Sequence, residues 1–182
     1  MTSDLRHAPE GPSTPSSNVF RVEVAPHGCF VCGDLNDHGL HVPLRVGDGR
    51  AWTELVLTSS HEGWAGVIHG GIIAALLDEV MGWALFQQDC WGVTAELGVR
   101  YKAPVTVGQR VRVEGWVTDV HRRIFHAAGH VVDAASGKVL CTGEATYMAA
   151  GEAQRAELQA RYHLRLVPLA SDDLALTPVG VR

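Results

Sequence analysis

The segment of residues 63–86, GWAGVIHGGIIAALLDEVMGWALF, constrains the fold more than any other part of the sequence. After a histidine and two glycines, apolar residues occupy nearly every side of a helix that should extend from about residue 70 to residue 87. Such a helix must be covered on more than one face. Two acids, Asp78 and Glu79, lie in its middle, where an ionised carboxylate is costly unless it is paired.

The rest of the chain offers strands to cover this helix. Two candidates, 40–46 and 51–57, precede it, and four more follow at about 91–102, 110–121, 124–134 and 138–149. Short turns between consecutive strands favour antiparallel pairing. The sequence therefore predicts an α+β fold, in which a curved antiparallel sheet wraps around one long central helix. The edges of such a sheet favour a dimer.

The chain length of 182 residues suits one domain with flanking segments. Residues 1–18 are rich in Pro, Ser and Thr and are predicted to be a disordered tail. Residues 19–39 form a leader with a cysteine pair, residues 40–150 the main domain, and residues 151–182 a C-terminal helix (about 151–163) and tail.

Charge and hydropathy exclude several classes of function. The net charge of −5 does not favour nucleic-acid binding. The longest apolar run, 67–86, contains His69 and both acids, so we expect no membrane span. The N-terminus lacks the apolar core of a secretory signal, and we expect a cytoplasmic location.

The cysteines raise the question of a metal. Cys29 and Cys32 form a C-x-x-C pair with His27, His38 and His41 close by. A structural zinc needs four such ligands, but a second pair is missing and the histidine spacing matches no standard finger. We expect no metal and reduced thiols packed in a capping segment, with structural zinc as the alternative.

Gly70 and Gly71 begin the helix, where free N–H groups and the positive end of the dipole favour an anion. These N–H groups could also stabilise an oxyanion that forms on a carbonyl. The alternative is a helix start where glycines allow close packing.

Asp78 is the stronger of the two acid candidates. Three of its helical neighbours, Ala74, Ala75 and Gly82, are very small, so the surface around it should be hollowed enough for a ligand. The alternative is a buried Asp paired with a hydroxyl or an arginine. Glu79 points about 100° away around the helix and is expected to form a salt bridge.

Gly70 and Asp78 are about 12 Å apart along the helix, too far to act on one carbonyl. Two antiparallel copies of the helix, side by side in a dimer, could bring them together. The hypothesis is that each site takes Gly70 from one subunit and Asp78 from the other.

The segment HGGIIAALLDEVMGWA, preceded by GWAGVI and followed by VRYKAPVTVG, resembles the hotdog-fold acyl-CoA thioesterases of the 4-hydroxybenzoyl-CoA and phenylacetate-degradation type. The resemblance covers about residues 40–149. It implies a hotdog fold, a dimer that often pairs into a tetramer, and hydrolysis of acyl-CoA to free acid and CoA without metal or cofactor.

The resemblance also implies roles for residues. Gly70 would supply the oxyanion N–H, with Gly71 beside the bound substrate, and Asp78 would be the base or the nucleophile. Thr94 would help to hold the carboxylate or a water, and His69 would shape the helix start.

Two further positions are less well defined. Arg122 and Arg123 match a basic pair near the CoA phosphates, or are simply a solvated turn. Many relatives place Asn or Gln before the helix to orient water. Here that place falls near Gly63, so His61 or Glu62 would have to substitute.

Two other functions remain open at this point. A hotdog hydratase would use His69 and Asp78 to move protons to and from carbon. A non-catalytic hotdog module would bind acyl-CoA without turnover. The acyl group cannot be read from the sequence, because candidate pocket residues such as Trp64 and Trp83 are expected to belong to the core.

Overall fold

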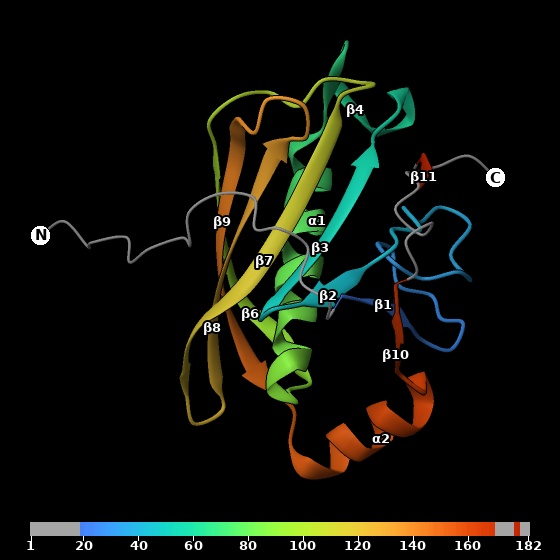
Figure 1. The fold of residues 1–182 in the computed structure, drawn as a ribbon, viewed down its shortest axis with the longest axis vertical. Coiled ribbons are helices and arrows are strands. Elements are labelled where there is room, and N and C mark those ends of the chain that lie inside the picture. The colour runs from blue at the N-terminus through green and yellow to red at the C-terminus, as the bar shows by residue number, and fades with distance from the viewer. Residues whose placement is uncertain (1–18, 170–176, 179–182) are drawn as a thin grey trace, which may run out of the picture.

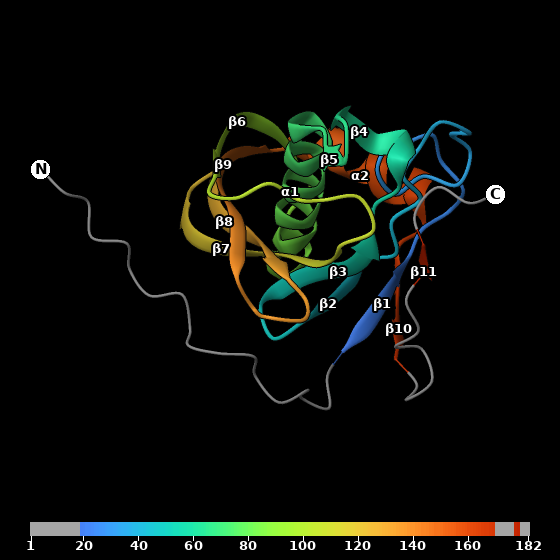
Figure 2. The ribbon, with the colours of Figure 1, turned by 90° about the horizontal axis from the view of Figure 1, so that it is seen from above.

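The computed structural model describes residues 19–169 and 177–178. One long helix, α1 (Gly70–Ala84), lies against the concave side of a nine-stranded sheet that curves around it (Figures 1 and 2). The predicted α+β fold, a sheet wrapped around one central helix, is confirmed. The predicted tail of residues 1–18 lies outside the described residues.

The central part of the sheet consists of five strands: β3 (Arg50–Val56), β6 (Gly92–Tyr101), β7 (Arg110–His121), β8 (Ile124–Asp133) and β9 (Val139–Ala149). The order across the sheet is β10-β1-β2-β3-β7-β8-β9-β6, and neighbours along this path are antiparallel. The shorter strands are β1 (Phe20–Glu23), β2 (Arg45–Gly47), β10 (Arg165–Pro168) and β11 (Thr177–Pro178), the last of which pairs parallel to β3. A separate pair, β4 (Glu62–Trp64) and β5 (Val67–Ile68), precedes α1, and α2 (Glu152–Tyr162) follows β9.

The boundaries differ from expectation at two places. The first predicted strand begins only at Arg45, because backbone N–H groups before it form hydrogen bonds with the leader instead of with a strand. The N–H of Leu40 donates to the carbonyl of Phe30, and the N–H of Val42 donates to the carbonyl of Val31. The central helix ends as an α-helix at Ala84 and continues as a 3-10 turn, Leu85–Gln88. A short 3-10 turn, Ser59–His61, also lies before β4.

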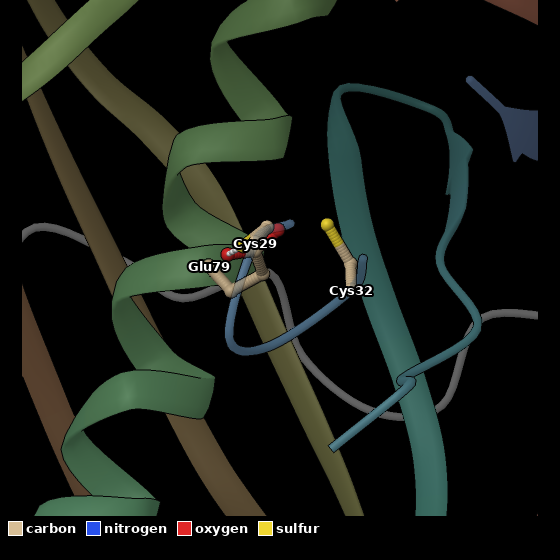
Figure 3. A group of neighbouring side chains, drawn as sticks. All are labelled: Cys29, Cys32 and Glu79. Carbon is tan, nitrogen blue, oxygen red and sulfur yellow. Dashed lines mark hydrogen bonds between the residues drawn. The ribbon is translucent and has the colours of Figure 1, made fainter. Parts of the chain in front are cut away.

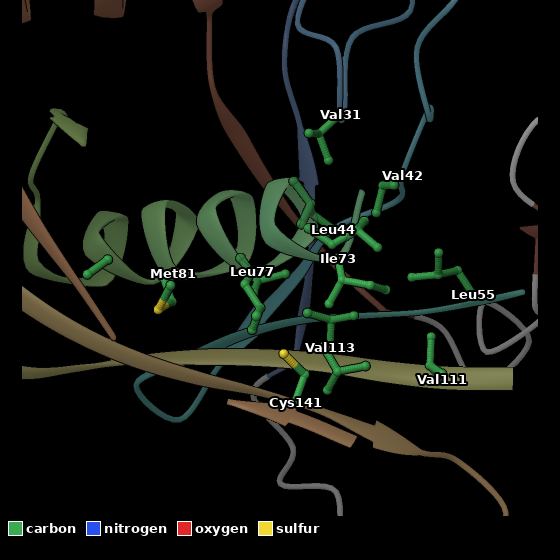
Figure 4. Packing of buried hydrophobic residues seen from close by; sticks show 14 of the residues in the cluster. Val31, Val42, Leu44, Leu55, Ile73, Leu77, Met81, Val111, Val113 and Cys141 are labelled. Carbon is green, nitrogen blue, oxygen red and sulfur yellow. The ribbon is translucent and has the colours of Figure 1, made fainter. Parts of the chain in front are cut away.

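The buried face of α1 explains its apolar composition. Leu76, Leu77, Val80 and Met81 are fully buried and share one core cluster with Val111, Val113 and Val131 of the sheet. Figure 4 shows Leu77 and Met81 on the side of α1 that faces the sheet. The segment Gly70–Gln88 also has the length and hydropathy of a membrane-crossing helix, a test that the core helix of a globular domain passes as well. Here the curved sheet covers one side of it.

A row of three glycines lets the helix approach the sheet closely. Gly115 of β7 pairs with Gly129 of β8, which in turn pairs with Gly143 of β9. A methyl group at Gly115 would lie 2.8 Å from the backbone nitrogen of Met81, and one at Gly129 would lie 3.1 Å from Cγ of Met81. The absence of side chains at this row sets how deeply α1 sits in the sheet.

Strand β6 forms one edge of the sheet. Most of its ten residues are exposed, and β9 is its neighbour in the described part of the chain. An exposed edge of this length is a template for pairing with another strand.

Candidate functional site

The carboxylate of Asp78 is held by two hydroxyl groups. Thr94 Oγ1 donates to Asp78 Oδ1 at 2.8 Å, and Tyr147 Oη donates to the same oxygen at 3.1 Å. Tyr147 Oη also donates to the backbone carbonyl of Asp78 at 2.8 Å. Because both hydroxyls reach the same oxygen, Oδ2 is left for another partner such as a water or a substrate atom.

The sheet brings these groups to Asp78. Thr94 of β6 is paired directly with Tyr147 of β9, so both residues stand at the same level beside α1. The pairing shifts between Thr94 and Glu96, which marks a bulge in β6. Bulges of this kind redirect side chains and are frequent beside functional sites.

Tyr147 is a site residue that the sequence analysis missed. It is only 2% exposed, and its ring edge lies beside Gly82, where an added methyl would come within 3.8 Å of Cε1. Burial and the charge of Asp78 raise the pKa of Tyr147 well above its ordinary value, so the hydroxyl remains a donor at neutral pH. The available signal was a tyrosine on the inward side of a strand, since buried tyrosine hydroxyls require a partner.

The start of α1 is capped by His69. Its Nδ1 accepts the N–H of Gly71 at 2.9 Å, and the Gly70 carbonyl accepts the hydroxyl of Tyr101 at 2.7 Å. The Gly71 N–H is therefore engaged within the helix start, and Gly70 provides the N–H that remains a candidate for a ligand. Tyr101, which is 54% exposed, was not predicted as part of this region.

A shallow apolar cavity of about 450 Å³ lies beside Gly70. Its lining includes Ile73, Tyr101, Pro104 and Trp64. Trp64 is 83% exposed, so the expectation that it belongs to the core is wrong. By contrast, Trp83 is half-buried and packs against the core.

The loop before α1 contains the two proposed substitutes for a water-orienting amide. His61 Nδ1 accepts the N–H of Thr58 at 3.2 Å, and burial lowers its pKa, which keeps the ring neutral at pH 7. The carbonyl of His61 accepts the N–H of His69 at 2.8 Å, so this loop is tied to the helix start. Glu62 is exposed and accepts the N–H of Gly66 at 3.0 Å.

The two predicted CoA-binding arginines lie at the turn between β7 and β8. Arg122 has a left-handed backbone with φ of 55°, and Arg123 donates to the carbonyl of Ala149 at 2.6 Å. Met148, the residue before Ala149, pairs with both Ile124 and Val93, whereas Tyr101, which contacts Gly70, pairs with Cys141 at the other end of β9, so this turn lies at the end of the sheet away from Gly70. Within one chain, the structure brings Thr94 to Asp78 but does not bring this arginine pair to the helix start.

Glu79 does not form the salt bridge that we expected. Its Oε1 accepts the indole N–H of Trp83 at 2.7 Å, and its Oε2 accepts the thiol of Cys29 at 3.6 Å. It therefore faces the leader, whereas Asp78 faces β6 and β9. Burial raises the pKa of Glu79 to about 7.

Comparison with known proteins shows which family the central part of the chain is similar to. Residues 65–140, which include α1, β6 and β7, match the family model described as the thioesterase superfamily. This match covers the central part of the chain, and the fold is the hotdog fold of the solved thioesterase structures, as the sequence resemblance implied.

Particular relatives cover the same region. Acyl-coenzyme A thioesterase 13 of Homo sapiens is 23% identical over 100 residues, which are 54% of this chain and 71% of the relative, and the Mus musculus protein is 22% identical over 95 residues. The crystal structure of a thioesterase superfamily protein has a TM-score of 0.63 and 30% identity, covering 66% of this chain but only 60% of that one. Zebra fish thioesterase superfamily member 2 has a TM-score of 0.57 and 21% identity, covering 65% of this chain and 87% of that one. A Streptococcus mutans protein bound to acetyl CoA has a TM-score of 0.54 and 17% identity, covering 57% and 83%.

Proposed function

We propose that this chain is an acyl-CoA thioesterase that hydrolyses its substrate to a free acid and CoA, with Asp78 as the catalytic carboxylate. The observation that carries the proposal is the pair of hydroxyl donors, Thr94 and Tyr147, on one oxygen of Asp78. The match to the thioesterase superfamily model and the acyl-CoA thioesterase relatives support the substrate class. The Streptococcus mutans structure supports CoA binding, since it holds acetyl CoA.

The spacing of the two site residues adds support. Two mutant structures of a hypothetical thioesterase from Streptococcus pneumoniae are known, one with alanine in place of an aspartate and the other with alanine in place of a threonine. The aspartate and the threonine lie 16 positions apart in that protein. Asp78 and Thr94 have the same separation of 16.

The proposed chemistry requires an electrophilic carbonyl and a positioned oxygen nucleophile. The N–H of Gly70, at the positive end of α1, would stabilise the oxyanion that forms on the thioester carbonyl. Asp78 would remove a proton from an attacking water, or would attack the carbonyl itself to form a mixed anhydride that water then cleaves. In either route the C–S bond breaks and CoA leaves as a thiolate, which needs little help from an acid.

The two routes differ in the fate of oxygen. A single turnover in water labelled with ¹⁸O, followed by mass analysis of the peptide that contains Asp78, separates them. Label in the carboxylate of Asp78 supports the nucleophilic route, because the anhydride can open at the enzyme carbonyl. Label in the product acid alone fits the general-base route and also an anhydride that water opens at its acyl carbonyl, and borohydride, which reduces an anhydride at Asp78, separates these two cases.

Asp78→Asn is the direct test of the assignment. The amide cannot accept a proton or attack, so turnover should fall by about 10²–10⁴-fold while acyl-CoA still binds. Asp89→Asn is the matched control, since it removes an exposed carboxylate beyond the end of α1. Turnover near the wild-type rate in Asp78→Asn would exclude Asp78 as the catalytic group.

We further propose that the site is shared between two chains. Gly70 and Asp78 of one helix are about 12 Å apart, too far for one carbonyl to meet both. The exposed edge of β6 offers pairing to a second copy, which would place the two α1 helices side by side and antiparallel. Sedimentation velocity should then find a dimer or a pair of dimers.

Mixed dimers test the sharing of residues. One chain carries Gly70→Pro, which removes the N–H, and the other carries Asp78→Ala. A mixed dimer retains one intact site if the residues come from different chains, so activity should reappear upon mixing two inactive proteins. If mixing restores no activity although mixed dimers form, the two residues do not combine across chains.

A hydratase is the less favoured enzyme, because Nδ1 of His69 is occupied as the helix cap. Release of free thiol from a saturated acyl-CoA, measured beside hydration of an enoyl-CoA, distinguishes the two activities. Tight binding of acyl-CoA with neither reaction would favour the non-catalytic binding module.

A further inference from the structure

We propose that Cys29, Cys32 and Glu79 form a zinc site that joins the leader to the central helix. The three side chains lie together although Glu79 is 50 residues from Cys29 in the sequence. Their ligand atoms, two sulfurs and one carboxylate oxygen, all lie within 4.8 Å of one another. Figure 3 shows Cys29 beside the Glu79 carboxylate and the sulfur of Cys32 turned toward this pair.

The separations suit a shared ion. In a tetrahedral site with Zn–S of about 2.3 Å and Zn–O of about 2.1 Å, a sulfur and an oxygen ligand lie about 3.6 Å apart. The distance from Cys29 Sγ to Glu79 Oε2 is 3.6 Å. A thiol–carboxylate hydrogen bond would also have this length, so the assignment depends on the convergence of the third donor, Cys32, on the same point.

The leader loop is built to present the two sulfurs. The N–H of Val31 donates to Cys29 Sγ at 3.4 Å, and the N–H of Gly33 donates to the carbonyl of Cys29 at 3.1 Å. A methyl group at Gly33 would lie 2.4 Å from the backbone nitrogen of Cys29, so only glycine fits this turn. The N–H of Val31, which this tight turn directs at Cys29 Sγ, stabilises a thiolate, and the thiolate is the form of cysteine that binds zinc.

Outer groups orient the ligands. Trp83 holds Oε1 of Glu79 at 2.7 Å, which leaves Oε2 facing the sulfurs. His27 Nδ1 accepts the N–H of Cys29 at 3.3 Å, so the proton of the neutral ring is on Nε2, which lies 3.9 Å from Cys32 Sγ. His27 therefore acts as a donor to the sulfur rather than as a fourth ligand. Groups in such positions fix ligand geometry in metal sites.

The ligand set selects the metal. Two thiolates favour zinc over magnesium or calcium, and a carboxylate is an accepted zinc ligand. Three protein ligands leave a fourth position for water. Three anionic ligands crowded together repel one another, and a divalent cation removes that repulsion. From the sequence alone, structural zinc was only the alternative, because the leader does not supply four Cys and His ligands; the third ligand of the proposed site comes from α1.

The first experiment measures zinc in the full chain, expressed with added zinc and purified in reducing buffer without chelator. We expect about one zinc per chain by elemental mass spectrometry. Cys32→Ser and Glu79→Gln should lose most of it, whereas Cys90→Ala, which removes a buried thiol outside the cluster, should retain it. Equal zinc in all four proteins would overturn the proposal.

A second measurement keeps the proposal testable if those variants fail to fold. Metal-free wild-type protein, titrated with Co²⁺, should show the near-ultraviolet absorption of thiolate-to-cobalt charge transfer, and zinc should remove it. Trp83→Phe retains an aromatic ring but loses the N–H, and should weaken cobalt and zinc affinity by about 10–100-fold. Absence of zinc together with absence of this absorption, or a Cys29–Cys32 disulfide that persists in reducing buffer, would show that the pair does not bind metal.

Discussion

The hydroxyl of Tyr147 should contribute directly to the reactivity of Asp78. Tyr147→Phe removes a hydrogen-bond donor from a charged carboxylate and leaves the ring in place beside Gly82. Hydrogen bonds to charged groups contribute about 1.5–3 kcal/mol. Here the same hydroxyl is shared with the Asp78 carbonyl, which is the nearer acceptor at 2.8 Å, so the lower end of that range applies.

A loss of about 1.5 kcal/mol corresponds to a decrease of about tenfold in kcat, because 1.4 kcal/mol is a factor of ten. The Asp78 carbonyl retains its helical partner four residues on, so the variant should fold. The assay is release of free CoA thiol under saturating acyl-CoA, with KM expected to change little. Tyr162→Phe is the control, since it removes a tyrosine hydroxyl in α2, which lies outside this site.

A double-mutant cycle with Thr94→Val sharpens this prediction. Both hydroxyls act on Oδ1 of Asp78, so their effects should not add, and the second change should cost less than it does alone. If Tyr147→Phe stays within about twofold of wild-type kcat, or if the two effects are strictly additive, then the hydroxyls do not act together on the carboxylate.

Three further outcomes concern stability. Gly115→Ala should lower the free energy of unfolding by about 1–3 kcal/mol, because the methyl meets the backbone of α1. Gly143→Ala should cost less, because its methyl meets side-chain atoms, Leu77 Cδ1 at 3.3 Å and Met81 Cε at 3.4 Å, rather than backbone; denaturant unfolding with the order reversed would contradict this steric reasoning. Burial alone raises the pKa of Glu114, but a hydrogen bond from His130 and the charges of Arg112 and Arg50 outweigh it and lower this pKa to about 2. The stabilisation by ionised Glu114 should therefore be complete above about pH 5 and should decrease as the pH falls toward 2. Between pH 6 and pH 3 the free energy of unfolding of the wild-type protein should fall by about 1–2 kcal/mol more than that of Glu114→Gln. Equal decreases in the two proteins would refute this. Removal of bound zinc by a chelator should lower the Tm of wild-type protein but leave that of Glu79→Gln unchanged, and equal shifts would contradict a metal at Glu79.

The central part of the fold could be predicted because its signals are local. The four strands after the helix have alternating patterns and short turns, and their observed bounds differ from the predicted ones by at most one residue. Strands β1 and β10 were missed because each has only four residues and each gains stability from pairing with the other rather than from its own pattern.

The same distinction applies to the site. Asp78 could be singled out from its small helical neighbours, and the resemblance directed attention to Thr94. Tyr147 could not be found, because its contact with Asp78 spans 69 residues and depends on the register of β9. The contact of Glu79 with Cys29 could not be predicted either, because it joins the helix to the leader over 50 residues and no local sequence pattern indicates that these two segments pack together.

The row of glycines beneath α1 has a consequence for how the chain reaches its fold. Side chains in a strand alternate between faces. If β7 were shifted by two residues along β8, Val113 or Val117 would therefore take the position of Gly115 against the helix. Neither valine leaves room for the backbone of Met81, and an intermediate with that pairing could not close the sheet over the helix. We therefore expect docking of the helix to disfavour hairpins in that register, because α1 fits closely only over the row of three glycines.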